Sequence, residues 1–598
     1  MAKYKPREIL LGYHKPEVGS GIKFISASIT GNFTLGMRGI TGGRLAKLSD
    51  RVSRRIAYSS TRSYGMLLVS FGFLSMLIHF IKGYLGYYEE LPMGILITCA
   101  VLSAVAVPLL VFDKPLCLAL QDFPPTDHLF FEFFCIKRMH YTTEEKGIHP
   151  VIALFVGIAL AALGTFVPVV WVMLGFLALV YLYLTFISPE FSFLLIFLAI
   201  PYLPLLPYAG HLLASAVGVT LVSFARKVFQ GKRVYYFEQY DLLIYLFLAA
   251  VMVGGVFFNS SSALGSLIMT LLTGGYVLSG CLITNRRLAD CAVNAVVISS
   301  IPVSIMAVIY FILNLARHGT AGLVPVSATF ENSSTLAVFL LISAAFAFYF
   351  IIEARSGGVR TAYIFILGLL SLALVTTLEL WALVAAAVGI IAYGFTKVRR
   401  TSGALLGITA LLPYGVVLLP AGALDAIDSL PLLSSLELPS VAERFMTSLR
   451  IFISNILFGV GVGEGGFASA YEALTDRSLP DSGNLLLEIG CEMGVIALVL
   501  FLLIFLVRMA HRIIYVPYVR NSQVGRLCRF TSATTVMLFV FGAVFYIWSD
   551  MTVYYMFWCV FGIGSATLRV SKREFDDRVG YFRDGSGSDS SNIDIVIR

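Results

Sequence analysis

Long apolar runs separated by short polar connections repeat along most of this chain. The runs begin at Tyr64, continue to Val570, and each spans about 17–25 residues, the length an α-helix needs to cross a bilayer. The first 62 residues are polar and basic instead. The pattern predicts an all-α, polytopic integral membrane protein with about 14–16 transmembrane helices.

Composition agrees with this fold class. The 598 residues are 58% hydrophobic and 13% charged, with a mean hydropathy of +0.86, which is far more apolar than a soluble domain. The eight cysteines include no Cys-x-x-Cys motif, and no outer cluster has metal-ligand spacing. We therefore expect neither a metal nor an organic cofactor.

The positive charges indicate the orientation. The net charge is +8, and the connections assigned to the cytoplasm are basic, whereas those assigned outside are short and acidic or neutral. This predicts a multi-pass protein of the cytoplasmic membrane with both termini in the cytoplasm. The basic amino-terminal segment is typical of an anchor to anionic membrane lipids. No folded basic module is visible, so a nucleic-acid partner is not expected.

The same reading divides the chain into four parts. They are a basic cytoplasmic segment at 1–63, additional transmembrane helices at 64–187 with a cytoplasmic insert at 113–149, a membrane core at 188–570, and a cytoplasmic tail at 571–598 expected to be disordered.

One large outer loop, residues 421–483, interrupts the membrane core. It contains PSVAERFMTSLRIFISNILFG, whose apolar residues fall on one helical face, so we expect an amphipathic helix along the membrane surface. A glycine-rich turn, FGVGVGEGGF, follows at 458–467. The loop then ends in PDSGN, a polar lip that leads directly into the next apolar helix.

These pieces, in this order, resemble the O-antigen ligase and polysaccharide polymerase superfamily. The likeness rests on the arginine-bearing amphipathic helix, the Gly-Val-Gly-x-Gly-x-x-x-Phe turn, a polar residue with Asn at the lip, and three spans after the loop. It covers roughly residues 190–570. It implies transfer or polymerisation of glycan from a polyprenyl-pyrophosphate-linked donor to a glycan or lipid-linked acceptor, with other polysaccharide-assembly proteins as possible partners.

Two positions depart from the family pattern. The lip of the family is usually His-Asn, and its histidine is taken as the catalytic base, but this chain has Gly483-Asn484. Ligases also carry an arginine for the donor pyrophosphate at the outer end of an earlier helix, where this chain has Glu379. The departures favour a divergent polymerase or a changed substrate over strict ligase chemistry.

Candidate residues follow from the chemistry that such a transfer needs. One arginine can donate two parallel hydrogen bonds to the oxygens of a phosphate. A carboxylate or an imidazole can act as the general base that takes the proton of the attacking hydroxyl. We expect Glu488 to face the protein interior within reach of Arg444 or Arg450. Each candidate also has a structural interpretation, such as a surface charge, a helix cap or a turn glycine. The catalytic candidates are Glu488, Asp481 and His318; the substrate-binding candidates are Arg444, Arg450, Arg317, Asn484, Glu379, Gly461 and Gly463.

The expected function is thus a membrane glycosyltransferase that acts at the outer face of the cytoplasmic membrane. Two other classes remain open. A lipid-linked-sugar flippase or other transporter would need ionisable residues within the spans. A non-catalytic member of a polysaccharide assembly complex would be consistent with the glycine at position 483.

Overall fold

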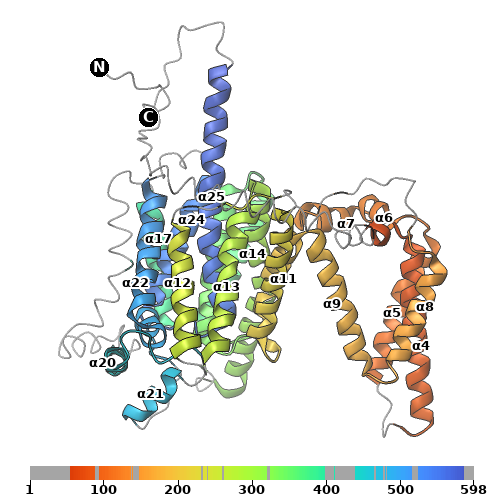
Figure 1. The fold of residues 1–598 in the computed structure, drawn as a ribbon, viewed down its shortest axis with the longest axis horizontal. Helices are drawn as coiled ribbons and strands as arrows, with labels where there is room; N and C mark the ends of the chain where they lie inside the picture. Colours follow the sequence, from red (N-terminus) through yellow and green to blue (C-terminus); the bar gives the residue numbers. More distant parts are fainter. Residues whose placement is uncertain are drawn as a thin grey trace. The chain divides into compact units, whose positions relative to one another are not determined.

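A computed structural model of the chain describes residues 51, 54–87, 93–136, 138, 147–229, 233–236, 238, 240–258, 262–319, 323–396, 410, 438–463, 466–475, 479, 481–514 and 523–584 (Figure 1). These ranges contain helices and no strand, apart from an isolated bridge between Ser60 and Pro115. Ten of the helices are long and apolar enough to cross a membrane, and five shorter ones are also apolar. The predicted all-α polytopic fold is confirmed, and the chain is a multi-pass membrane protein.

The described residues form two compact units. The first lies within Met1–Asp122, Met139–Phe176 and Phe224–Val234, and the second within Phe123–Arg138, Leu177–Ser223 and Tyr235–Arg598. The predicted domain boundaries at 63, 187 and 570 remain predictions.

The first unit is built around α4 (Thr61–Tyr84), which packs along both α5 (Met93–Val111) and α8 (Pro150–Leu163). Small residues allow these helices to approach closely. A Cβ at Gly72 would overlap Ser103 of α5, and a Cβ at Gly157 of α8 would overlap Ser70 of α4. Close contact through small residues is the usual packing mode of helices in lipid. The short helix α6 (Leu116–Asp122) completes this unit.

The second unit is a larger helix bundle. Its helices in chain order are α7 (Pro124–Thr126), η1 (Asp127–Phe133), most of α9 (Val169–Ile187), α10 (Pro189–Ala199), η2 (Ile200–Leu205), most of α11 (Ala209–Phe229), α12 (Asp241–Val253), η3 (Gly254–Phe258), α13 (Ala263–Leu282), α14 (Arg286–His318), α15 (Ser333–Glu353), α16 (Gly357–Thr376), α17 (Leu380–Phe395), α20 (Leu438–Ser454), α21 (Gly466–Thr475), α22 (Leu485–Ile514), α24 (Gln523–Phe541) and α25 (Met551–Asp584).

The most deeply buried elements of this bundle are α24 and α25, with α13 packed along α25 and α12 along α22. Aromatic side chains fill the space among them. The ring of Trp548 lies 5.0 Å from Phe501 and 5.4 Å from Phe557, measured between ring centroids. Figure 1 shows α20 and α21 together at the end of the bundle where α22 begins. Both helices contact α22.

One boundary differs from the sequence-based expectation. Hydropathy predicts a span at 530–548, but the helix ends at Phe541, and residues 542–550 form turns that fold against the start of α22. Buried apolar turns and membrane helices have the same hydropathy, which explains the error. At 192–224 the sequence favours two spans over one kinked helix, and the structure has two helices, α10 and α11, with η2 and its Pro201 and Pro204 between them.

The amphipathic helix expected in the outer loop is present as α20. Other expectations lie outside the described residues. They concern 1–50, the span at 402–420 apart from residue 410, the loop at 421–437, residues 139–146 of the insert, and the tail beyond 584. Residues 571–584, which are expected to begin a disordered tail, instead continue helix α25.

Candidate functional site

Asn484 caps the first turn of α22 and ties it to the turns after α24. Its Oδ1 accepts a hydrogen bond from the Leu487 amide at 3.0 Å, and its Nδ2 donates to the Ala543 carbonyl at 2.8 Å. The Leu485 amide donates to the carbonyl of Gly542 at 2.7 Å. Asparagine is among the preferred N-cap residues because its side chain satisfies an amide that has no helical partner. Of the two interpretations of Asn484, the structure supports the cap.

The helix α22 is broken at Gly494, and amides of the glycine-rich turn donate hydrogen bonds to the carbonyls that the break leaves without helical partners. Gly494 has φ +81° and ψ 176°, so the helical ladder stops there. The amides of Val460 and Gly461 donate to the carbonyls of Cys491 and Glu492, at 2.7 and 3.0 Å. These carbonyls end the first half of the helix, where intrahelical partners are lacking. The turn therefore substitutes for a missing turn of helix.

Positive φ angles explain the glycines of this turn. Gly459, Gly461 and Gly463 have φ angles of +70°, +103° and +100°, a region that side chains with a Cβ rarely adopt. The Gly461 amide donates a hydrogen bond to the main-chain carbonyl of Glu492, and the Gly463 amide lies 3.5 Å from the Glu492 carboxylate. Gly461 and Gly463, which are substrate-binding candidates from the sequence with turn glycines as the alternative, thus direct their amides to α22 in this structure.

Gly494→Ala is expected to destabilise the protein by more than about 1 kcal/mol, since it imposes left-handed strain on a residue with a Cβ. That Cβ would also overlap the carbonyl oxygen of Leu457. The measurement is the thermal unfolding of purified protein in detergent. Gly368→Ala is the matched control, because Gly368 lies within α16 with nothing near its Cβ position. This variant should unfold at the wild-type temperature or above it, since alanine favours a helix interior more than glycine does.

Two carboxylates lie buried one turn apart beneath the glycine turn. Glu488 is fully buried, and its Oε2 accepts a hydrogen bond from the Ser482 amide at 2.6 Å. Its Oε1 has no hydrogen-bond partner among the described residues. Glu492 is 6% exposed and accepts a hydrogen bond from the Tyr546 hydroxyl at 3.0 Å. Sequence reasoning missed Glu492, although its place four residues after Glu488 puts both on one helix face.

Arg444 lies beside the polar lip. The arginine is half-buried on α20, and a Cβ at Gly483 would come within 3.0 Å of its Nη1. Gly483 itself has φ +69°. A histidine at position 483 would therefore need both a strained backbone and space that Arg444 occupies.

Asp481 belongs to the same polar lip, two residues before Gly483. It is partly buried, and its Oδ1 accepts a hydrogen bond from the Gly483 amide at 2.9 Å. Burial raises the pKa of Asp481 above the ordinary aspartate value, while the Gly483 amide and the charge of Arg444 oppose that increase. Asp481 is thus a carboxyl with a raised pKa next to a permanent cation.

The remaining candidates lie apart from this cluster. Arg450 is exposed on α20, and Arg317 and His318 are exposed at the end of α14, with no hydrogen bond or ion pair to the described residues of the cluster. Glu379 accepts hydrogen bonds from Ser333, at 2.9 Å, and Ser334. These serines begin α15, where a carboxylate is favoured by the helix dipole. The geometry gives Glu379 a structural role.

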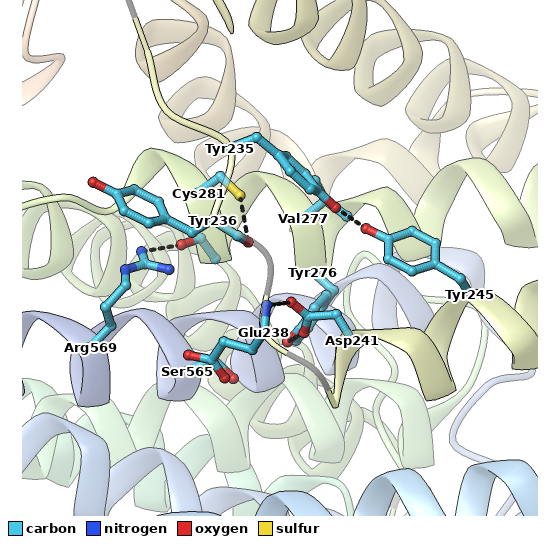
Figure 2. Close-up of a pocket in the computed structure, with 11 residues that line it drawn as sticks. Tyr235, Tyr236, Glu238, Asp241, Tyr245, Tyr276, Val277, Cys281, Ser565 and Arg569 are labelled. Atoms are coloured by element: carbon cyan, nitrogen blue, oxygen red, sulfur yellow. Dashed lines mark hydrogen bonds between the residues drawn. The ribbon is translucent and has the colours of Figure 1, made fainter. Parts of the chain in front are cut away.

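A second charged cluster lies further along α22, toward its carboxyl-terminal end, and Figure 2 shows its members Glu238, Asp241, Tyr276 and Arg569. Arg508 is buried there, and its Nη1 donates to Glu238 at 2.7 Å, while Nη2 contacts Asp241 and the Tyr276 hydroxyl. Nearby, the guanidinium of Arg569 lies 3.9 Å from the centroid of the Tyr236 ring. Sequence reasoning treated Arg508 as a topology charge and missed its partners.

The polar groups of this second cluster largely satisfy one another. Asp241 accepts from the Glu238 amide at 2.7 Å and from the Tyr276 hydroxyl at 2.5 Å, and the hydroxyls of Tyr235 and Tyr245 form a pair. We therefore interpret the Arg508 network as a structural lock between α12, α13 and α22. The cluster around Asp481 includes the half-buried Arg444 and the Glu488 Oε1 that lacks a hydrogen-bond partner among the described residues. This cluster is the candidate functional site.

Within the described ranges, no group of three or more His, Cys, Asp or Glu side chains could hold a metal ion. No known protein-family model matches the chain, and no curated protein matches it either. The function is therefore argued from the residues and their geometry.

Proposed function

We propose that this protein is a membrane glycosyltransferase of the O-antigen ligase and polymerase type. It would transfer or polymerise glycan from a polyprenyl-pyrophosphate donor at the outer face of the cytoplasmic membrane. The observation that carries the proposal is the closeness of Arg444 and Asp481 to the same glycine at the mouth of a membrane helix: a Cβ at Gly483 would lie 3.0 Å from the Arg444 Nη1, and the Gly483 amide donates a hydrogen bond to Asp481. An accessible cation and a carboxyl of raised pKa, side by side, are what such a transfer requires.

In this proposal the two residues have separate roles. The guanidinium of Arg444 binds the pyrophosphate, whose charge grows as its bond to the sugar breaks. The acceptor hydroxyl attacks the anomeric carbon, its proton passes to the Asp481 carboxylate, and polyprenyl pyrophosphate leaves. Glu488 stabilises the conformation of the lip by accepting a hydrogen bond from the Ser482 amide, and it does not contact the substrate.

The direct test uses purified protein in liposomes with a labelled polyprenyl-pyrophosphate oligosaccharide and an acceptor. Product glycan of higher mass, together with released polyprenyl pyrophosphate, would support the transfer. Well-folded protein that leaves an authentic donor unchanged would count against it, and would favour the non-catalytic interpretation.

Asp481→Asn is expected to lower turnover by about 10²–10⁴-fold, the usual contribution of a general base, with donor binding retained. The base works deprotonated, so wild-type activity should increase with pH through the Asp481 pKa. Because burial raises that pKa, the acid limb of the kcat/KM profile should lie above the ordinary aspartate range. Glu443→Gln, an exposed acid on α20, is the control that keeps activity.

Proton-coupled transport, including flipping of lipid-linked sugars, is the second candidate. It is favoured by the break in α22 at Gly494 with buried Glu488 and Glu492 beside it, since broken helices and buried carboxylates line many transport pathways. Substrate-driven proton movement into liposomes, lost in Glu488→Gln but unaffected by Asp481→Asn, would select this function over glycosyl transfer.

A further inference from the structure

Two cysteines of the second unit lie side by side. Cys135 follows η1, and Cys291 lies in the second turn of α14. Both sulfur atoms are 3.7 Å from one oxygen, the carbonyl of Glu132, and the two thiols are within hydrogen-bonding reach of each other. The other six of the eight cysteines are fully buried, whereas these two are partly exposed. Cys135 and Cys291 are therefore close to each other and partly exposed to solvent.

The surroundings of Cys135 distinguish it from a structural thiol. Its φ is +53°, a left-handed conformation that residues with a Cβ seldom adopt and that the surrounding structure must hold in place. Part of that hold comes from Phe134, whose ring packs 4.7 Å from the ring of Phe191 on α10. The guanidinium of Arg287 lies 4.0 Å from the Glu132 carboxylate, next to the pair.

The electrostatics favour a thiolate at Cys135. The hydrogen bond from Cys291 and the positive charge of Arg287 lower the pKa of the Cys135 thiol, against opposing contributions from burial and from Glu190. A thiolate is the form that reacts with peroxides and disulfides. Cys135 therefore has the character of an attacking thiol and Cys291 that of a resolving thiol.

We propose that Cys135 and Cys291 form a redox-active thiol pair that a hydroperoxide oxidises reversibly to a disulfide. The Cys135 thiolate attacks one peroxide oxygen, giving a sulfenic acid and releasing hydroxide or alkoxide. The Cys291 sulfur then attacks the sulfenic sulfur, forming the S–S bond and releasing water. Overall, two thiols and one hydroperoxide give one disulfide, one water and one water or alcohol, and a dithiol reductant reverses the reaction.

The disulfide would connect two parts of the chain that are far apart in sequence. It would join the segment Phe123–Arg138 covalently to α14, two elements that now meet through Glu132, Arg287 and the two thiols. The basic start of α14 is expected in the cytoplasm, where thiols are kept reduced and disulfides are transient signals. This proposal is independent of the glycosyltransferase proposal.

The test uses the purified full-length chain in detergent, reduced and then treated with hydrogen peroxide. After denaturation, a maleimide-polyethylene glycol reagent counts the free thiols. We expect the count to fall from eight to six, and to return to eight with dithiothreitol. Peptide mapping of the oxidised protein should identify one cross-linked pair, Cys135–Cys291.

Variants separate the two roles. Cys291→Ser should stop at a sulfenic acid on Cys135 that dimedone traps, and Cys135→Ser should form no disulfide. Arg287→Gln should slow oxidation several-fold while Arg287→Lys retains the rate, because the lysine keeps the charge. The matched control is Cys117→Ser, which removes a buried cysteine and should leave the disulfide unchanged.

The wild-type protein alone can refute the proposal. Eight free thiols after peroxide, a different cross-linked pair, or oxidation of Cys135 to sulfinic acid without a disulfide would each overturn it. A rate that is unchanged in Arg287→Gln would remove the proposed role of the arginine.

Discussion

Arg444→Ala is expected to reduce glycan transfer by at least about 100-fold, the effect of removing one donor that stabilises developing charge. The variant should still insert and fold, because Arg444 lies on α20, outside the membrane-spanning helices, and makes no buried ion pair in the described structure. Arg444→Lys should recover part of the activity, since a point charge attracts pyrophosphate but cannot bind it in two parallel hydrogen bonds. The measurement is the rate of product formation in liposomes.

Arg360→Ala is the matched control for this experiment. Arg360 is an exposed arginine near a helix end, in the first turn of α16, and its removal should leave the rate unchanged. Wild-type rates in both Arg444 variants would make Arg444 an ordinary surface charge.

Arg508→Met is expected to cost about 3–5 kcal/mol of stability, the typical effect of removing one partner from a buried ion pair. The loss leaves Asp241 buried without its cation and Glu238 without its 2.7 Å partner. In thermal unfolding the variant should melt several degrees below the wild type or fail to accumulate as folded protein. Since the cluster is a structural lock, glycan transfer per folded molecule should remain near the wild-type value.

The double variant Arg508→Met with Asp241→Asn tests the pairing itself. Neutralising the abandoned carboxylate should restore part of the stability, giving a coupling energy well above zero. Additive losses would show that Arg508 acts through packing alone. Arg360→Met, at an exposed position, should unfold as the wild type does.

Features that depend on local sequence could be predicted, and those that depend on distant partners could not. The apolar lengths of α13 and α22 and the periodicity of α20 indicated these helices directly. The glycines at 459–463 indicated a turn, but not the helix break that the turn repairs. That break requires Gly494 to meet residues more than thirty positions earlier in the chain.

The charged groups illustrate the same limit. Arg508 and Asp241 are separated by 267 positions, so their pairing leaves no local pattern. Glu492 could have been predicted, because its position four residues after Glu488 places both carboxylates on one helix face. The hydropathy of residues 542–550 wrongly predicts the end of a membrane helix, because Tyr546 and Trp548 are buried against protein in turns.

The amides of Val460 and Gly461 meet α22 at fixed carbonyls, which limits where the length of this chain can change during evolution. An insertion or deletion within 456–461 would shift both amides off Cys491 and Glu492 and leave those carbonyls unsatisfied. The described residues 467–475 make no such hydrogen bond to the backbone of α22. Relatives of this protein should therefore vary in length after the glycine turn and keep the turn itself constant.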